Sequence, residues 1–224
     1  MKVLTRVALI LSVTAASTPL YAETAAERLA ESATILKEVM DAPDKGIPSD
    51  LLRSAHCVVI VPGLKKAGLI VGGKYGRGFL VCRGADKSWG APAALRIEGG
   101  SFGFQIGASE SDVIMLLMDE RSVQGIVASK FTLGGDADVA AGPVGRSATA
   151  QTDATMRAKI LSYSRSRGVF AGIALTGATL RQDLDENNEM YGRQWTTREI
   201  VDGRVAPPRA ASDLIELLTK YSRG

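Results

Sequence analysis

Basic residues gather in short polar stretches between apolar runs, and their spacing suggests a binding site for anions. Three stretches hold one pair each: Lys65 with Lys66, Lys74 with Arg77, and Arg165 with Arg167. We expect these stretches to be turns. If they lie at one end of a sheet, they form a positive patch for phosphate head groups, with Lys as point charges and Arg as a bidentate fork. The alternative interpretation is dispersed, solvated charge.

No catalytic set stands out in the chain. His56 is the single histidine, so a Ser-His-Asp triad would have to use it. The G-x-S-x-G pattern at 99–103 lies within an expected bent strand and not at the strand-to-helix turn that a nucleophile elbow needs. His56 and Cys57 are adjacent, and on a strand they point to opposite faces, which argues against a zinc site shared with Cys82. We therefore expect no enzyme, no metal and no cofactor, and a hydrolase is the least favoured class.

Two further motifs resemble ligand loops without completing them. Residues 72–78 run as G-G-x-x-G-x-G, but they open no expected helix and lack the G-K-[ST] ending, so they indicate sheet curvature. Residues 183–187 have the D-x-D-x-N spacing of a calcium loop. Asn188 and Gln194 stand where that loop needs Gly and Glu. The expected role of this segment is an exposed polar turn or a helix cap.

Cys57 and Cys82 lie at the start and the end of neighbouring expected strands, where a disulfide could join them. An exported chain with two cysteines favours such a bridge. Two buried thiols that pack as small apolar groups are the alternative. Sequence spacing does not fix the Cα separation that a bridge requires, so both interpretations stay open.

Residues 1–22 have the pattern of a secretory signal peptide. Lys2 and Arg6 precede an apolar stretch over 7–16, and Ala22 stands before the expected cleavage point. We expect a soluble exported protein, periplasmic or secreted. Without this leader, 25 basic residues face 24 acidic ones, and aromatic residues are few. This balance argues against nucleic acid as a partner.

The rest of the chain predicts an α+β fold with a mostly antiparallel, strongly curved or barrel-like sheet. Amphipathic helices are expected over 23–41 and in the C-terminal segment after a Ser212 cap. Between them lie short apolar runs bounded by Gly and Pro, which is typical of strands. Val58–Val61 and Leu69–Val71 are expected to be separate strands around a Pro-Gly turn. The first helix could cover the sheet or lie on a membrane, and its acidic residues favour the first role.

Several long blocks, in the right order over residues 33–192, resemble the SYLF domain. The first runs from Ala55 to Gly78 as A-x-x-V-V-I-V-P-G-x-x-K-A-G-x-x-V-G-G-x-Y-G-R-G. GGSFGFQIG, LGGDADVAAGPVGR, YSRSRG and GVFAGIALTGATL follow, and Asn188 with Tyr191-Gly192 resembles the C-terminal signature. The resemblance implies lipid binding, since eukaryotic members are described as binding phosphoinositides through a basic surface and an amphipathic helix. Some yeast members also bind actin.

This chain differs from the eukaryotic pattern by its leader and by the absence of an SH3 or FYVE domain, so actin binding is not expected. We divide it into a signal peptide (1–22), a single SYLF-like domain (23–206), and a linker with a C-terminal helix (207–224). The expected function is a periplasmic module that binds anionic lipid or a membrane surface. The alternative is an envelope scaffold that binds a protein.

Overall fold

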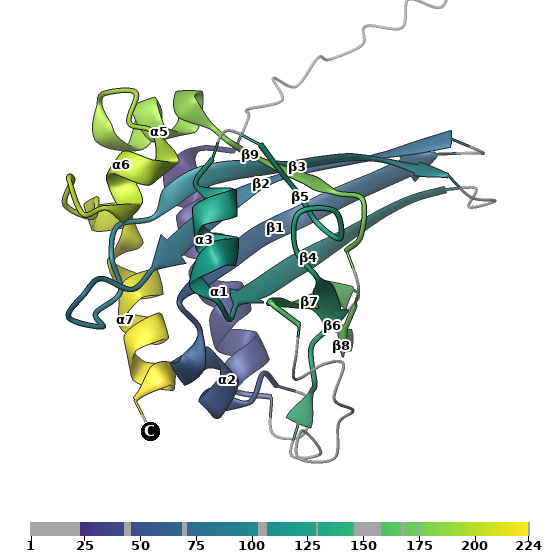
Figure 1. Cartoon of the computed structure of the whole chain (residues 1–224), viewed down its shortest axis with the longest axis horizontal. Coiled ribbons are helices and arrows are strands. Elements are labelled where there is room, and N and C mark those ends of the chain that lie inside the picture. Colours follow the sequence, from purple (N-terminus) through teal and green to yellow (C-terminus); the bar gives the residue numbers. More distant parts are fainter. Residues whose placement is uncertain are drawn as a thin grey trace, which may run out of the picture.

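The computed structural model describes residues 23–42, 46–68, 71–102, 107–128, 130–145, 158–166, 169–173 and 175–223 (Figure 1). The predicted signal peptide and Arg167 lie outside these ranges. Within the described residues, no helix is both long enough and apolar enough to cross a membrane.

A strongly curled sheet of nine described strands forms the centre of the molecule, as predicted. Its strands are β1 (Cys57–Gly68), β2 (Val71–Cys82), β3 (Ala93–Phe102), β4 (Gly107–Leu117), β5 (Lys130–Thr132), β6 (Val139–Ala141), β7 (Ile160–Ser166), β8 (Val169–Gly172) and β9 (Thr179–Gln182). Their order is β5-β9-β3-β2-β1-β4-β7-β6, with β8 paired to β7. Every pair is antiparallel except β6–β7, so the predicted α+β class with a mostly antiparallel sheet is confirmed.

Helices cover both faces of the sheet and bury β1 from both sides. They are α1 (Ala25–Met40), α2 (Ser49–Ser54), α3 (Glu120–Ile126), α5 (Leu184–Tyr191), α6 (Thr197–Val201) and α7 (Ser212–Ser222). Val58 and Ile60 of β1 belong to a cluster with α1, α2 and α7. Val59 and Val61 belong to a second cluster with α3 and β5. Figure 1 shows α3 in front of the sheet and α1 behind it. Burial on both faces explains the unbroken apolar run over 58–61.

Helix α1 begins with a capping box and covers the sheet, as predicted. The Thr24 hydroxyl accepts the Glu27 N–H at 3.2 Å, and the Glu27 carboxylate accepts the Thr24 N–H at 2.8 Å. Leu29, Leu36 and Val39 lie on one side of the helix and are buried against the sheet. In this conformation the apolar side of α1 is not available to lie on a membrane.

The prediction of a turn at Pro62-Gly63 was wrong, because this pair forms a β-bulge inside β1. The register with β4 shifts between Val61 and Leu64, and Gly63 has a φ of +55°. Its N–H donates to the Asp112 carboxylate of β4 at 3.0 Å, which holds the chain beside β4 instead of reversing it. The strand then continues to Gly68, so the two predicted strands are not divided at this pair.

The predicted Ser212 cap was also wrong. A short 3-10 turn, Arg209–Ala211, precedes α7, and Ser212 is already inside the helix. Its hydroxyl donates to the Arg209 carbonyl at 2.8 Å rather than accepting a free N–H of the helix. The predicted C-terminal helix itself is present, and it buries Leu214 and Leu218 in the cluster that also contains α1.

The outer halves of β1–β4 extend past the rest of the molecule (Figure 1). We call this part the tongue and define it as residues 64–68, 71–76, 97–102 and 107–111. Strand β9 pairs with β3 only over Leu95–Glu98, and β7 pairs with β4 only over Asp112–Leu117. Beyond the pairing of β9 with Ile97 and Glu98, the described tongue is a ribbon of four strands.

Candidate functional site

The described basic residues that we predicted as a site all lie on strands, not in turns. Lys65 and Lys66 are in β1, Lys74 and Arg77 are in β2, and Arg165 is in β7. The predicted turn location was wrong, because the bulge at Gly63 and the glycines of β2 keep the chain extended. Arg167 lies outside the described residues.

Three of these residues lie close together at the middle of the tongue. In the ladder between β1 and β2, Lys66 lies directly opposite Lys74, and Lys65 lies opposite Tyr75. None of the three lysines forms an ion pair with another described residue. We call Lys65, Lys66 and Lys74 the lysine band.

The pairing of Lys66 with Lys74 places two like charges opposite each other, which is unfavourable in a sheet. Burial, and after it the charge of Lys66, lowers the pKa of Lys74. The Lys74 ammonium has one weak contact, to the Thr176 carbonyl at 3.4 Å. The neighbour of Lys66 across the ladder on β4 is Ser109, and the neighbour of Lys74 on β3 is Gly99. Neither residue carries a charge. An external anion between the two ammonium groups would relieve their repulsion.

A pocket of about 160 Å³ opens on the α1 side of the bulge, next to Lys65 and Tyr75. Charged groups of both signs line it: Glu23, Glu31 and Glu110 on one hand, and Arg28, Lys65 and Arg77 on the other. Burial raises the pKa of Glu31, and a hydrogen bond with Glu23 and the nearby carboxylates raise it further. The mixed charge makes this pocket a poor site for a simple anion.

Arg77 is held in a buried ion-pair network. Its Nε donates to the Asp183 carboxylate at 2.8 Å and lies 3.1 Å from a Glu186 oxygen. The side chain of Glu186 is fully buried and also pairs with Arg28 of α1. The network of Arg28, Arg77, Asp183 and Glu186 thus ties α1 and β2 to α5. Its arginines already have carboxylate partners, so it holds the fold together rather than offering free positive charge.

The pKa values of the two acids in this network, Asp183 and Glu186, shift in opposite directions. Burial alone would raise the pKa of Asp183, but the hydrogen bonds from Arg77 and from the Glu186 N–H outweigh burial and lower it. Burial raises the pKa of Glu186 even though Arg28 and Arg77 oppose the shift. Asp183 therefore keeps its charge more firmly than Glu186 does.

Arg165 is likewise bound to carboxylates. Its Nε and a terminal nitrogen each lie 2.8 Å from Asp112 of β4, and its other terminal nitrogen pairs with Glu38 of α1. These contacts fasten α1 to the sheet. Of the predicted site residues within the described ranges, the structure thus separates two structural arginines from the three residues of the lysine band.

Sequence reasoning missed the buried network, although the chain carries signals for it. Asp183 is the N-cap of α5 and accepts the Glu186 N–H at 3.3 Å, so the predicted helix cap is correct. The alternative prediction, an exposed polar turn, does not fit Asp183, which is only 1% exposed. Arg77 lies on the same face of β2 as the buried Phe79, two residues further along the strand. A charge on an apolar face predicts a buried partner of opposite sign.

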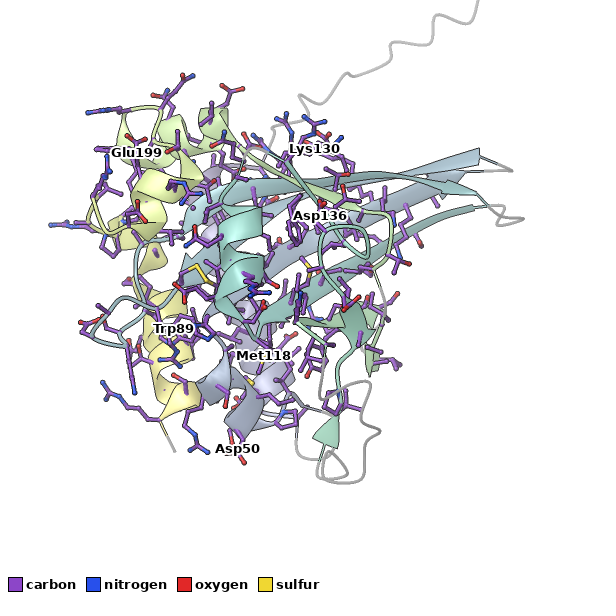
Figure 2. All side chains as sticks on the ribbon, in the orientation of Figure 1. Asp50, Trp89, Met118, Lys130, Asp136 and Glu199 are labelled. Atoms are coloured by element: carbon purple, nitrogen blue, oxygen red, sulfur yellow. A yellow bond between two sulfur atoms is a disulfide. The ribbon has the colours of Figure 1, made fainter. Side chains whose placement is uncertain are left out.

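His56, Cys57 and Cys82 are the remaining candidates from the sequence. His56 is exposed at the junction of α2 and β1. Cys57 and Cys82 lie opposite each other in the ladder, with their Cα atoms 4.0 Å apart, and a disulfide joins them (Figure 2). Within the described residues, no group of His, Cys, Asp and Glu side chains could hold a metal ion.

Comparisons with known proteins agree with the resemblance noted from the sequence. Residues 98–221 match the family model Ysc84, described as "Las17-binding protein actin regulator". SH3 domain-containing YSC84-like protein 1 of Rattus norvegicus is 34% identical over 198 residues, which cover 86% of this chain and 58% of the relative. LAS seventeen-binding protein 3 of Saccharomyces cerevisiae (strain ATCC 204508 / S288c) is 36% identical over 180 residues, which cover 78% of this chain and 39% of the relative. The chain thus spans only part of the length of these relatives.

Proposed function

The chain belongs to the Ysc84 family, whose domain is also called SYLF, and we propose that it is a binding module that attaches to anionic membrane surfaces through the lysine band. The observation that carries this proposal is the pair Lys66 and Lys74, two like charges placed opposite each other without a carboxylate partner among the described residues. A basic side chain near an anionic membrane contributes about 1 kcal/mol to binding. Three such side chains give about 3 kcal/mol.

The charges around the band support the same assignment. Glu98 of β3 is already paired with Arg96 at 2.6 Å and with Arg181 at 3.3 Å. Glu110 lies opposite Lys65 in the ladder with β4, so Lys65 has an acidic neighbour. Lys66 and Lys74 face the other side of the tongue, away from Glu110. They are therefore the strongest anion-binding members of the band.

We further propose that the protein acts outside the cytoplasm, in the periplasm or as a secreted protein. Support comes from the signal-peptide pattern of residues 1–22 and from the disulfide, a bond that persists in oxidising compartments. The ligand is then the anionic head group of an envelope lipid or of lipopolysaccharide.

A vesicle flotation experiment tests the proposed function. The protein is mixed with phosphatidylcholine vesicles, either pure or containing about one third phosphatidylglycerol, at low and at high salt. We expect flotation with the anionic vesicles at low salt and a marked loss at high salt, because salt screens exposed charges. Equal flotation with neutral vesicles, or none with either, would contradict the proposal.

The second candidate is a scaffold that binds another protein. The names of the relatives favour it, since one is called a LAS seventeen-binding protein and another an SH3 domain-containing protein. Val169 is an apolar residue of β8, the strand that pairs with β7, and it is 61% exposed. Affinity capture that yields a stoichiometric partner, together with absent flotation, would favour this function over membrane attachment.

A further inference from the structure

A row of basic residues crosses four neighbouring strands outside the tongue. Lys130 of β5 lies opposite Arg181 of β9. Arg181 lies opposite Arg96 of β3, which in turn lies opposite Arg77 of β2. Side chains directly opposite each other in a sheet point to the same face. Arg77 shares its face of β2 with Phe79, which packs in the cluster with α1, so the whole row lies on the α1 face.

The row passes from the interior of the molecule to its surface. Arg77 belongs to the buried ion-pair network described above, whereas the other three residues become more exposed toward the sheet edge. The side chain of Arg96 is 36% exposed, that of Arg181 is 41% exposed, and Lys130 is exposed on the edge strand. Figure 2 shows Lys130 at the rim of the molecule. We call Arg96, Arg181 and Lys130 the basic row.

One carboxylate faces the three cations of the basic row. Glu98 lies 2.6 Å from the Nε of Arg96 and 3.3 Å from the Nε of Arg181. Lys130 forms no ion pair with another described residue. Three cations and one carboxylate leave a net charge of +2. Like charges opposite each other in a sheet repel, so a bound anion would stabilise this arrangement.

The position of Glu98 also prepares the two guanidinium groups for a ligand. Both arginines approach the same carboxylate through Nε, and their terminal nitrogens form no hydrogen bond with another described residue. The terminal nitrogens of an arginine form the fork that binds phosphate in a bidentate manner. Two such forks and the ammonium group of Lys130 can each donate to a different oxygen of one tetrahedral group.

We propose that the basic row binds a soluble phosphate, either inorganic phosphate or the phosphate group of a small monoester. Such a group carries about −1.5 to −2 charges at pH 7 and three acceptor oxygens, which matches the net charge and the three donors of the row. A carboxylate has one charge and two oxygens, so it would leave one cation of the row without a partner.

This site is separate from the lysine band and goes beyond the proposed function. Lys66 and Lys74 lie on the face of the sheet opposite to Lys65 and Tyr75, and Tyr75 shares its face of β2 with Arg77. The basic row and the two strongest members of the lysine band therefore lie on opposite faces. A membrane held at Lys66 and Lys74 leaves the row open to solvent.

Titration calorimetry with the full chain tests the inference. Inorganic phosphate, glycerol 3-phosphate and acetate are titrated at constant ionic strength, because salt screens exposed charges. We expect both phosphates to bind with one molecule per chain, and acetate to bind at least about tenfold more weakly, since it makes fewer charged hydrogen bonds. Failure of the wild type to bind either phosphate, or equal affinity for acetate, would overturn the inference.

Two variants and a matched control locate the site. Arg96→Gln combined with Arg181→Gln should weaken phosphate binding about a hundredfold, and Lys130→Gln about tenfold. Lys130 has no described ion pair to lose, so its variant tests the site without disturbing the fold. The control combines Arg121→Gln and Arg209→Gln, two exposed arginines outside the row, and should bind phosphate like the wild type.

Unchanged binding in the first two variants, or an equal loss in the control, would overturn the inference. Flotation with phosphatidylglycerol vesicles separates this site from the proposed function. The Arg96→Gln, Arg181→Gln variant should float like the wild type, and a loss of flotation would contradict a site separate from the membrane contact. Phosphate binding by a wild-type protein that does not float would contradict the proposed function alone.

Discussion

At the scale of single residues, the structure assigns different tasks to basic side chains that look alike in the sequence. Arg28 and Arg77 neutralise two carboxylates, Asp183 and Glu186, whose side chains are almost fully buried. Arginine suits this task because its planar fork binds two acids at once. The lysine band, in contrast, has no carboxylate partner among the described residues and remains available to an outside ligand.

Replacing Arg28 by Met should destabilise the fold strongly. The Arg28 side chain is 8% exposed, and its loss leaves the buried Glu186 with one cation fewer. Removal of one partner of a buried pair costs about 3–5 kcal/mol in free energy of unfolding. Chemical denaturation of the wild type and the variant measures this difference.

The matched control is Arg53→Met, which breaks the exposed pair with Asp50 on α2. Exposed pairs contribute about 1 kcal/mol or less, so this variant should unfold close to the wild type. If both variants lost the same free energy, the network would not have the structural role described above.

The sequence indicated which residues are charged but not which charges are paired. Pairing depends on residues more than 50 positions away, such as Asp112 for Arg165 and Asp183 for Arg77. Local spacing contains no information on contacts of this range, so it could not identify Asp112 and Asp183 as the partners.

At the scale of elements, α1 and β4 bring several carboxylates close together. The N-terminal half of α1 brings Glu31 near Glu110 and Asp112. Burial raises the pKa of Glu31 most, the hydrogen bond and charge of Glu23 come next, and the charges of Asp112 and Glu110 add to the shift. A group whose pKa is raised by folding stabilises the fold most below its unfolded pKa. That contribution is lost as pH rises through the raised value.

Glu31→Gln should therefore raise the melting temperature at about pH 8, where the wild-type carboxylate is charged, and have little effect at about pH 4. Thermal unfolding at both pH values measures the difference. Glu27→Gln on the same helix is the control. The hydrogen bonds of Thr24 lower the pKa of Glu27, so this variant should not raise the melting temperature. An equal gain at both pH values for Glu31→Gln would contradict the charge-crowding explanation.

The elements themselves were largely predictable, since apolar periodicity showed α1, α7 and most strands. The bulge at Pro62-Gly63 was not. A Pro-Gly pair between two apolar runs looks the same whether the chain reverses or only shifts register. The decision comes from the ladder with β4, which resumes at Leu64 opposite Ser111 and carries β1 into the tongue.

At the scale of the whole molecule, the structure separates a packed body from a projecting ribbon. The body has helices on both faces, three apolar clusters and a disulfide between β1 and β2. The tongue carries the lysine band on β1 and β2, with Glu98 and Glu110 in the same cross-strand row as Lys65. Composition alone could not reveal this separation, because near-neutral overall charge hides three neighbouring lysines on two paired strands.

The central claim is that the lysine band makes the membrane contact, and vesicle affinity of a triple variant tests it most directly. Lys65, Lys66 and Lys74 are all replaced by Gln. The control replaces Lys87, Lys130 and Lys159 by Gln and changes the net charge equally. Lys130 lies on β5, set back from the free end of the tongue (Figure 2).

Each lysine of the band contributes about 1 kcal/mol to membrane binding, so the first variant should bind anionic vesicles about a hundredfold more weakly. The control should bind like the wild type. Equal loss in both variants, or no loss in the first, would contradict the claim.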